Sequence, residues 1–129
     1  IRDRSPSRGL GDVYKRQVAI QIQPNYLNAL WTRALAYLQL NQHLNGIQDL
    51  NAVIALDPYT STHYANRGTA YNSLGYFEWA LEDYNYAIWL NPTDGLAYNN
   101  RGANYTSMGQ AELALSDRNT ACSLDIRFC

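Results

Sequence analysis

The charged residues that recur in this sequence are three arginines and three aspartates in matched spacing. Each arginine precedes its aspartate by 16 positions, in the pairs Arg33 with Asp49, Arg67 with Asp83, and Arg101 with Asp117. A guanidinium fits a carboxylate through two parallel hydrogen bonds, so we expect ion pairs within or between structural units. The alternative is a ring of arginines that binds an acidic ligand. Because each arginine recurs together with an aspartate, the pattern favours structural ion pairs over a ligand-binding ring.

Patterns typical of catalysis or metal binding do not occur in the sequence. His43 and His63 are not at ligand spacing for each other, and there is no Cys/His pattern, phosphate-binding glycine loop or G-x-S-x-G. Neighbouring acids such as Glu82 and Asp83 are more typical of a solvated helix face. We therefore expect no enzymatic activity in this chain, no cofactor and no metal site.

The elements that must position these charges repeat every 34 residues. Three prolines and three tyrosines share this register, namely Pro24, Pro58, Pro92, Tyr37, Tyr71 and Tyr105. A fixed period of this length indicates stacked repeats rather than one closed globule. Solenoids of this kind usually work as extended binding surfaces.

Each copy is predicted to form two antiparallel helices. In the second copy Tyr64, Gly68 and Tyr71 lie at i, i+4 and i+7, on one face of a helix, and a proline ends the helix that follows. The candidate N-caps of the first helices are Thr60 and Asp94. The predicted helix pairs are 26–40/43–56, 60–74/77–90 and 94–108/111–124.

Small residues recur where the two helices of a copy should meet. Gly68 and Gly102 belong to the first helix of their copies, and Ala80 and Ala114 belong to the second. Glycine inside a helix costs up to about 1 kcal/mol relative to alanine, so its recurrence indicates a packing reason. We expect these positions to let the helix axes approach closely.

The second copy resembles the tetratricopeptide repeat, whose pattern runs W-x2-L-G-x2-Y, then A-x3-F, then P. The matching residues are Tyr64, Gly68, Tyr71, Ala80, Tyr84 and Pro92. The third copy departs from the pattern at Arg118 and Ile126, and the first copy departs at Ala34 and Gly46. The resemblance covers about residues 18–129. It implies an all-α fold, a right-handed α-solenoid of stacked antiparallel helix hairpins.

The first 17 residues do not fit the repeat. They resemble translated sequencing-adaptor read-through, so we expect residues 1–17 to be a non-native, disordered leader; the alternative is a basic Ser/Arg-type arm that binds nucleic acid. Residues 18–25 resemble the end of a preceding repeat. Residues 26–129 are expected to hold three repeats, at about 27–60, 61–94 and 95–128. Because the chain starts with Ile and stops before a polar capping helix, we expect a truncated fragment.

The repeats are acidic and contain no lysine. The whole chain has a net charge of −1, and residues 1–17 carry five basic and two acidic residues, which leaves −4 for residues 18–129. This charge argues against nucleic acid and against an anionic membrane surface as partners. No run approaches the ~18 consecutive apolar residues of a membrane span. The two cysteines do not suggest a disulfide framework, and Cys122 shares its register with Ile54 and Ile88, which predicts a small buried hydrophobe.

In tetratricopeptide proteins the first helix of each hairpin lines a concave groove. The residues that the resemblance places there are Asn28, Trp31, Thr32, Leu35, Asn66, Thr69, Ser73, Asn99, Asn100 and Ser107. None of them is charged. The family's carboxylate clamp needs lysines and an arginine, but Trp31, Leu35 and Leu96 occupy three of its places, so a clamp is disfavoured.

What remains of the groove resembles an asparagine ladder. Asn66 and Asn100 are one period apart, and an amide can both donate to and accept from the main chain of an extended peptide. The alternative is that these are solvated polar residues. Trp31, Leu35 and Leu38 either form an apolar anchor pocket or pack against a preceding repeat. Trp79 and Trp89 are not repeated and mark either a convex contact or a hairpin stacking surface.

These observations predict a non-catalytic protein–protein interaction scaffold that binds an extended peptide segment in its concave groove. The alternative is a substrate-presenting arm of a larger enzyme, such as a glycosyltransferase or a signalling kinase. Helical-repeat RNA binding is disfavoured by the 34-residue spacing and by the acidic charge. The expected partner is a protein or peptide segment, with no nucleic acid and no membrane, and self-association through uncapped repeat ends is a further expectation.

Overall fold

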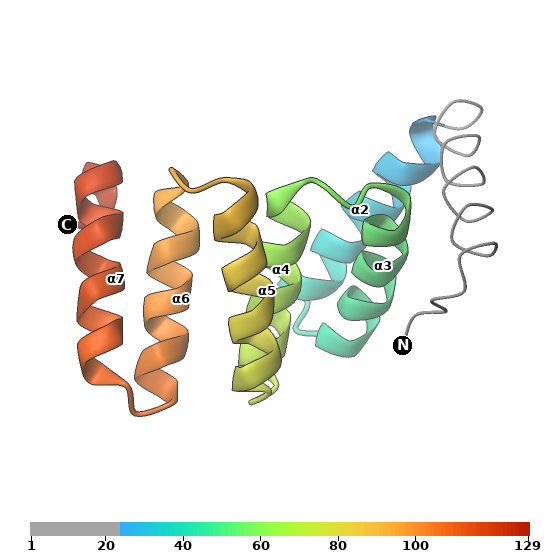
Figure 1. Ribbon diagram of the computed structural model, residues 1–129. Helices are drawn as coiled ribbons and strands as arrows, with labels where there is room; N and C mark the ends of the chain where they lie inside the picture. The colour runs from blue at the N-terminus through green and yellow to red at the C-terminus, as the bar shows by residue number, and fades with distance from the viewer. Residues whose placement is uncertain (1–23) are drawn as a thin grey trace, which may run out of the picture.

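The computed structural model describes residues 24–129, which contain six α-helices and a short 3-10 helix (Figure 1). The helices are α2 (Pro24–Gln39), α3 (His43–Leu56), α4 (Ser61–Ser73), α5 (Phe77–Leu90), α6 (Gly95–Ser107) and α7 (Ala111–Leu124), followed by η1 (Ile126–Phe128). The all-α expectation is confirmed. The expectations for the leader at 1–17 and for the preceding repeat over residues 18–23 lie outside the described residues.

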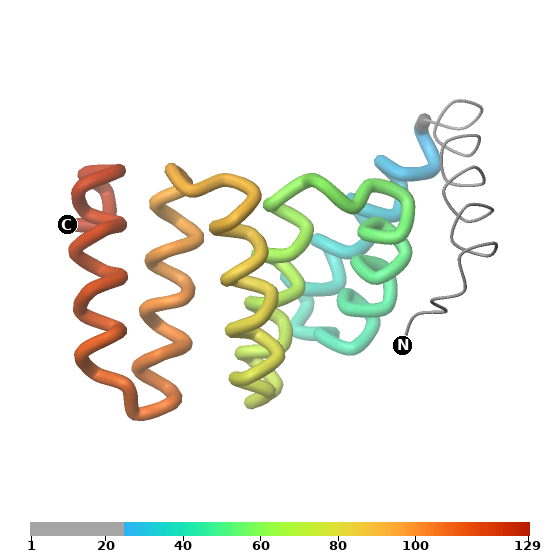
Figure 2. The backbone as a smooth tube through the Cα atoms, viewed as in Figure 1, coloured from blue at the N-terminus to red at the C-terminus, as the bar shows by residue number. Residues whose placement is uncertain are grey.

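The helices pack as three consecutive antiparallel hairpins, α2/α3, α4/α5 and α6/α7. Neighbouring hairpins meet through α3 against α4 and α5 against α6, and α4 also contacts α6. Figure 2 shows the three hairpins following one another along the molecule, from α2/α3 to α6/α7. The first helices α4 and α6 therefore adjoin each other along the stack.

The turn inside each hairpin depends on one residue with positive φ. These residues are Asn41 (φ 60°), Gly75 (φ 84°) and Gly109 (φ 76°), and they stand one period apart. Glycine adopts this left-handed backbone without a steric penalty, and asparagine tolerates it better than most residues. The second helices then begin and end at the predicted residues, whereas the first helices differ from prediction by one or two residues at their ends.

The close approach of the helices is visible at the recurring glycines. A Cβ atom added to Gly68 would lie 3.0 Å from Cε1 of Tyr84 and 3.2 Å from the carbonyl oxygen of Ala80. A Cβ atom on Gly102 would lie 3.2 Å from the carbonyl oxygen of Ala114. Ala80 and Ala114 are themselves fully buried. A larger side chain at either glycine would therefore push the two helices of its hairpin apart.

The two predicted N-caps differ. The Asp94 carboxylate accepts a hydrogen bond from the backbone N–H of Leu96 at 3.1 Å, as a capping residue should. The Thr60 hydroxyl makes no such bond, and the prediction for its side chain was wrong. It donates instead to Oδ2 of Asp57 at 2.8 Å, because that carboxylate lies in the same inter-repeat turn.

The prediction for the cysteines was also wrong. Cys122 is bonded to Cys129 in a disulfide and is only half-buried. The backbone after α7 turns back in η1, which brings the two Cα atoms to 4.6 Å. The disulfide therefore attaches the chain after α7 to the last turns of that helix, an arrangement that sequence spacing does not reveal.

Candidate functional site

Each recurring arginine binds the aspartate of its own repeat through two hydrogen bonds. The guanidinium donates from Nε to Oδ2 and from Nη2 to Oδ1, at distances between 2.7 and 2.8 Å in all three repeats. The three aspartates are buried. In addition, Nη1 of Arg67 donates to Oδ1 of Asn51 at 2.9 Å, and Nη1 of Arg101 donates to Oδ1 of Asn85 at 3.0 Å. These two arginines therefore connect their repeats to the preceding ones.

Aromatic rings enclose the same guanidinium groups. Cζ of Arg67 lies 5.7 Å from the ring centroid of Tyr64 and 5.9 Å from that of Tyr71, and Arg101 lies between Tyr98 and Tyr105 in the same way. Burial of Arg67 opposes its charge, but the hydrogen bonds and charge of Asp83 outweigh burial and raise the pKa of Arg67. These guanidinium groups are thus engaged inside the stack, which disfavours a ring of arginines for an acidic ligand.

The asparagines expected in the groove keep their side-chain amides unbonded within the described residues. Asn28 is exposed, whereas Asn66, Asn99 and Asn100 are half-buried on the first helices α4 and α6. Within residues 24–129 the side-chain amides of these four residues make no hydrogen bond. Each amide can therefore still offer two N–H donors and a carbonyl acceptor. Thr32, on α2, is exposed.

The hydroxyl groups expected in the groove are less available. Those of Thr69, Ser73 and Ser107 each donate to the backbone carbonyl four residues earlier, at 3.0 to 3.3 Å. Oγ1 of Thr69 also lies 2.9 Å from the phenol oxygen of Tyr84. The hydroxyl protons are thus used within the helices, and the amides are the main free polar groups on this face.

Trp31 packs toward the second repeat. Its ring lies edge-on to His63 of α4, with centroids 6.3 Å apart, and its buried Nε1 has no partner among the described residues. His63 is buried, and its Nε2 lies 3.0 Å from Oδ2 of Asp57. The expectation that Trp31 would pack against a preceding repeat missed this contact. Leu35, one turn after Trp31 on α2, is half-buried.

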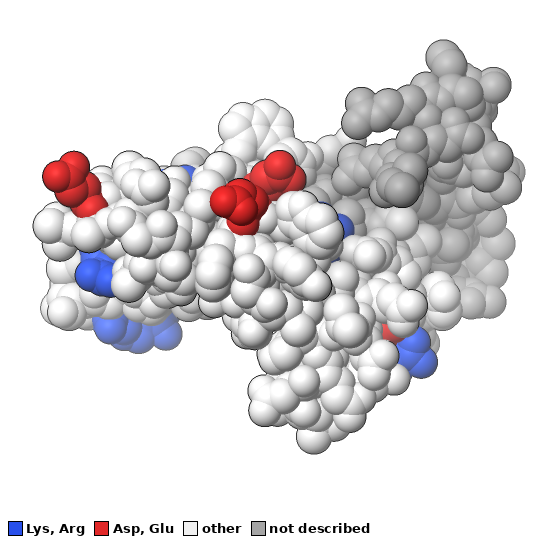
Figure 3. All heavy atoms as spheres, turned by 90° about the horizontal axis from the view of Figure 1, so that it is seen from below, with Lys and Arg blue, Asp and Glu red and all other residues white. Residues whose placement is uncertain are grey.

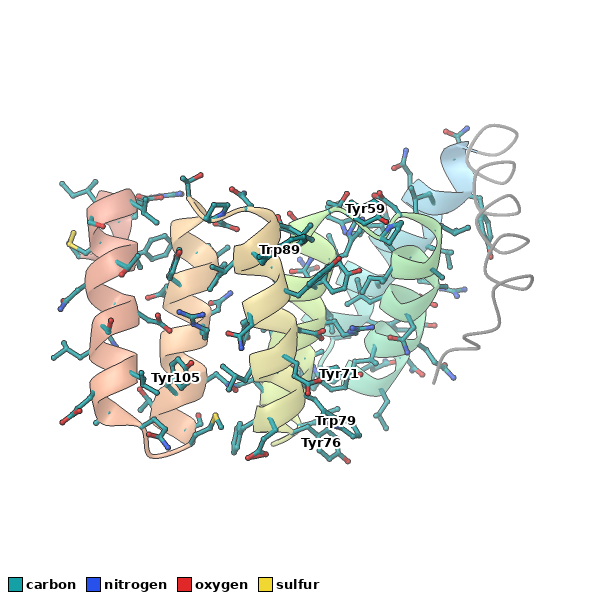
Figure 4. All side chains as sticks on the ribbon, in the orientation of Figure 1. Tyr59, Tyr71, Tyr76, Trp79, Trp89 and Tyr105 are labelled. Atoms are coloured by element: carbon teal, nitrogen blue, oxygen red, sulfur yellow. A yellow bond between two sulfur atoms is a disulfide. The ribbon has the colours of Figure 1, made fainter. Side chains whose placement is uncertain are left out.

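His63 is a residue whose environment the sequence reasoning did not anticipate. The sequence marked His63 as unusual only because it is not repeated: the matching positions in the other copies hold Ala29 and Ala97. The cluster of Tyr71, Tyr76 and Trp79 was not predicted either. Figure 4 shows these three rings together at the lower end of the α4/α5 hairpin, whereas Trp89 lies at its upper end. Tyr76 and Trp79 are about half exposed.

The remaining surface offers little charge and no metal site in the described part of the chain. Residues 24–129 contain no group of three or more His, Cys, Asp or Glu side chains that could hold a metal ion. None of the described helices is long and apolar enough to cross a membrane. Figure 3 shows a few acidic and basic side chains on an otherwise uncharged face.

Comparisons with known proteins identify similar helical-repeat sequences and structures. The sequence model of the tetratricopeptide repeat matches residues 27–60. The structure of the first TPR of Spaghetti (RPAP3) bound to the HSP90 peptide SRMEEVD is similar, with 27% identity, a TM-score of 0.74, and coverage of 77% of this chain and 79% of that one. The first TPR domain of human RPAP3 is 27% identical, with a TM-score of 0.75 and coverage of 79% and 80%.

A more distant structure shares the fold. The type III secretion chaperone SycD of Yersinia enterocolitica, in complex with a peptide of the translocator YopD, is 19% identical, with a TM-score of 0.74 and coverage of 78% and 76%. The comparison with curated protein sequences gives no match.

Proposed function

We propose that this chain, which belongs to the tetratricopeptide repeat family, binds an extended segment of a partner protein along the face formed by its first helices. The proposed contacts are main-chain hydrogen bonds to the amides of Asn66 and Asn100. In this role the chain is a non-catalytic protein–protein interaction scaffold. Whether it serves alone or presents substrates for a larger enzyme, the same face would bind the peptide.

The proposal rests on which polar side chains of α4 and α6 are already hydrogen-bonded and which are not. The amides of Asn66 and Asn100 lie one period apart on two helices that contact each other, and neither amide is used within the described residues. An extended peptide presents alternating N–H and C=O groups along its length, which an amide can satisfy in both directions. The neighbouring hydroxyl groups are already bonded to the helix backbone.

Similar structures support a peptide ligand, and the arginines of this chain argue against recognition of a terminal carboxylate. The RPAP3 domain is bound to an HSP90 peptide, SRMEEVD, in which three of the last four residues are acidic. In the present chain Arg67 and Arg101, which lie on α4 and α6, are each held by an aspartate. Because these cations are engaged, we propose a ligand that is recognised through its backbone, not through a terminal carboxylate.

The test is a double substitution, Asn66→Ala with Asn100→Ala, assayed by calorimetry against a peptide selected for binding to the parent chain. Leaving peptide groups unpaired in a buried contact costs about 1–3 kcal/mol per group, so affinity should fall at least about tenfold. The matched control is Asn119→Ala on α7, which removes an exposed, unbonded amide outside this face. Binding should also depend weakly on salt, since no charge is involved.

Two outcomes would contradict the proposal. One is unchanged affinity in the Asn66→Ala, Asn100→Ala double variant. The other is a steep loss of affinity with salt, which would indicate that charged groups elsewhere on the surface hold the peptide.

A further inference from the structure

We propose a second docking surface on this chain, an aromatic-acidic patch formed by Tyr76, Glu78, Trp79 and Glu82, which binds an arginine or lysine side chain in an exposed segment of a partner protein. The patch lies at the start of α5, a second helix, and shares no residue with the amide-bearing face of α4 and α6. The inference therefore does not depend on the proposed function.

The patch presents two partly exposed aromatic rings held in a defined arrangement. The Tyr76 and Trp79 rings are tilted by 36° with centroids 5.1 Å apart, and Trp79 also lies edge-on to Tyr71 at 5.4 Å. Tyr76 is 49% exposed and Trp79 is 55% exposed. Figure 4 shows both rings directed outward from the lower end of α5. Their outer faces are thus available to a ligand without any rearrangement of the hairpin.

The other two repeats show that the fold does not require these rings. The positions of Tyr76 and Trp79 hold Gln42 and Asn45 in the first repeat, and Gln110 and Leu113 in the third. All three repeats nevertheless form the same hairpin, with second helices that begin at His43, Phe77 and Ala111. By contrast Tyr71, which touches Trp79, is repeated. A pair of exposed aromatic residues that only one repeat carries points to a contact outside the fold.

Two exposed carboxylates, Glu78 and Glu82, stand on the first two turns of α5 near the rings in sequence and have no cation from the described chain. Helical spacing places Glu82 one turn after both Glu78 and Trp79. Neither glutamate forms an ion pair within residues 24–129, where the arginines bond to Asp49, Asp83, Thr106, Asp117 and Asp125 instead. Figure 3 shows acidic side chains in the middle of the face at this end of the molecule. Like charges one turn apart repel each other, and a cationic ligand would remove that repulsion.

The chain itself shows how such groups hold a cation. Arg67 lies over two tyrosine rings and is bonded to a carboxylate, and Arg101 has the same surroundings. The aromatic-acidic patch combines the same group types, aromatic faces and carboxylates, but residues 24–129 supply no cation to it. Cation–π attraction favours guanidinium or ammonium groups over neutral side chains at a ring face, and tryptophan is the strongest ring for it. A basic side chain of a partner protein completes this arrangement.

The experiment uses the whole chain and a synthetic peptide with three arginines separated by Gly-Ser, compared with the same peptide in which citrulline replaces each arginine. Citrulline keeps the shape of arginine but removes its charge. Binding is followed by the NMR signals of the three indole N–H groups, from Trp31, Trp79 and Trp89. We expect the arginine peptide to shift the Trp79 signal with saturation, whereas the citrulline peptide leaves it in place.

Variants distinguish a specific patch from attraction to a net negative chain. Trp79→Ala lacks the reporting indole, so its binding is measured by calorimetry. It should weaken binding by about fivefold, the change expected for one exposed cation–π contact. Glu78→Gln with Glu82→Gln should weaken it similarly. Glu112→Gln is the matched control, because Glu112 stands one period after Glu78 on α7 without aromatic neighbours of this kind. It should leave binding unchanged, as should Asn66→Ala with Asn100→Ala.

Three results would overturn the inference. They are equal binding of the citrulline peptide, no effect of the Glu78→Gln, Glu82→Gln double variant, and an equal loss of binding in Glu112→Gln. The glutamate substitutions are at exposed positions, so they test the patch even if Trp79→Ala disturbs the hairpin.

Discussion

Nδ2 of Asn72 donates a hydrogen bond to Oδ1 of Asn104 at 2.7 Å, and this contact joins α4 to α6. Asn104 is fully buried, and its own Nδ2 donates to the carbonyl oxygen of Phe77 at 3.0 Å. The corresponding residues one repeat earlier are Leu38 and Ala70. The junction between the second and third repeats therefore contains a buried polar link where the junction before it has apolar residues.

Asn104→Ala should destabilise the chain by about 1–3 kcal/mol, because the Asn72 amide and the Phe77 carbonyl lose their partner in a buried site. Urea unfolding followed by circular dichroism measures this. Adding Asn72→Leu to Asn104→Ala recreates the apolar pair of the preceding junction and should restore part of the loss. A single variant as stable as the parent would mean that water replaces the amide without cost.

Gly68→Leu and Gly102→Leu should each lower the denaturant midpoint, since a Cβ atom at either position would already lie 3.2 Å from a carbonyl oxygen of the neighbouring helix. Overpacking of this kind typically costs about 1–3 kcal/mol. Thr62→Leu, at an exposed position of α4, controls for the change in residue type. The close-packing explanation fails if either glycine variant unfolds at the parent's midpoint.

Arg67→Met should cost about 3 kcal/mol, because it leaves the Asp83 carboxylate buried without its counter-ion. Arg33→Met should cost less, since the Arg33 side chain is 60% exposed, against 17% for Arg67, and water can reach Asp49 once the guanidinium is gone. Chemical denaturation of both variants under the same buffer gives the comparison. Equal losses would show that exposure of the arginine does not matter.

Stability should fall at alkaline pH through Tyr84. Burial raises the pKa of its phenol from 10.0 to about 12, although the hydrogen bond with Thr69 opposes the shift. The folded state thus favours the neutral phenol, so this stabilisation is complete below pH 10 and is lost as pH rises toward 12. The loss amounts to about 2–3 kcal/mol for a shift of this size.

The control for this titration is Tyr84→Phe, in which the other tyrosines remain. We expect the free energy of unfolding of the variant to decline less than that of the parent between pH 10 and pH 12. Parallel decline of the two proteins would exclude Tyr84 as the group responsible.

Much of the hairpin stack could be predicted because the residues that the structure requires recur in each of the three copies. Three features recur at this period: the positive-φ turns, the glycines at the close contacts and the arginine–aspartate spacing. Each further copy of a feature argues against its being a coincidence of sequence. Local preferences and periodicity act over one helix or one turn, so they can be read along the chain. The placement of Asn66 and Asn100 in a groove came instead from the resemblance to the tetratricopeptide repeat, and it stays a prediction.

The sequence by itself determined the repeat, the helix boundaries to within one or two residues, and the identity of the paired charges. Only the tertiary structure decided which groups are already used. It showed that Arg67 and Arg101 also bond asparagines of the preceding repeat. It also showed that the hydroxyls of Thr69, Ser73 and Ser107 bond their own helices, and that Cys122 forms a disulfide with Cys129. The Asn104 link and the Tyr76–Trp79 contact likewise involve residues that occur in one repeat only. Such contacts depend on distances between individual side chains in the folded stack, and a unique residue leaves no period from which those distances could be inferred.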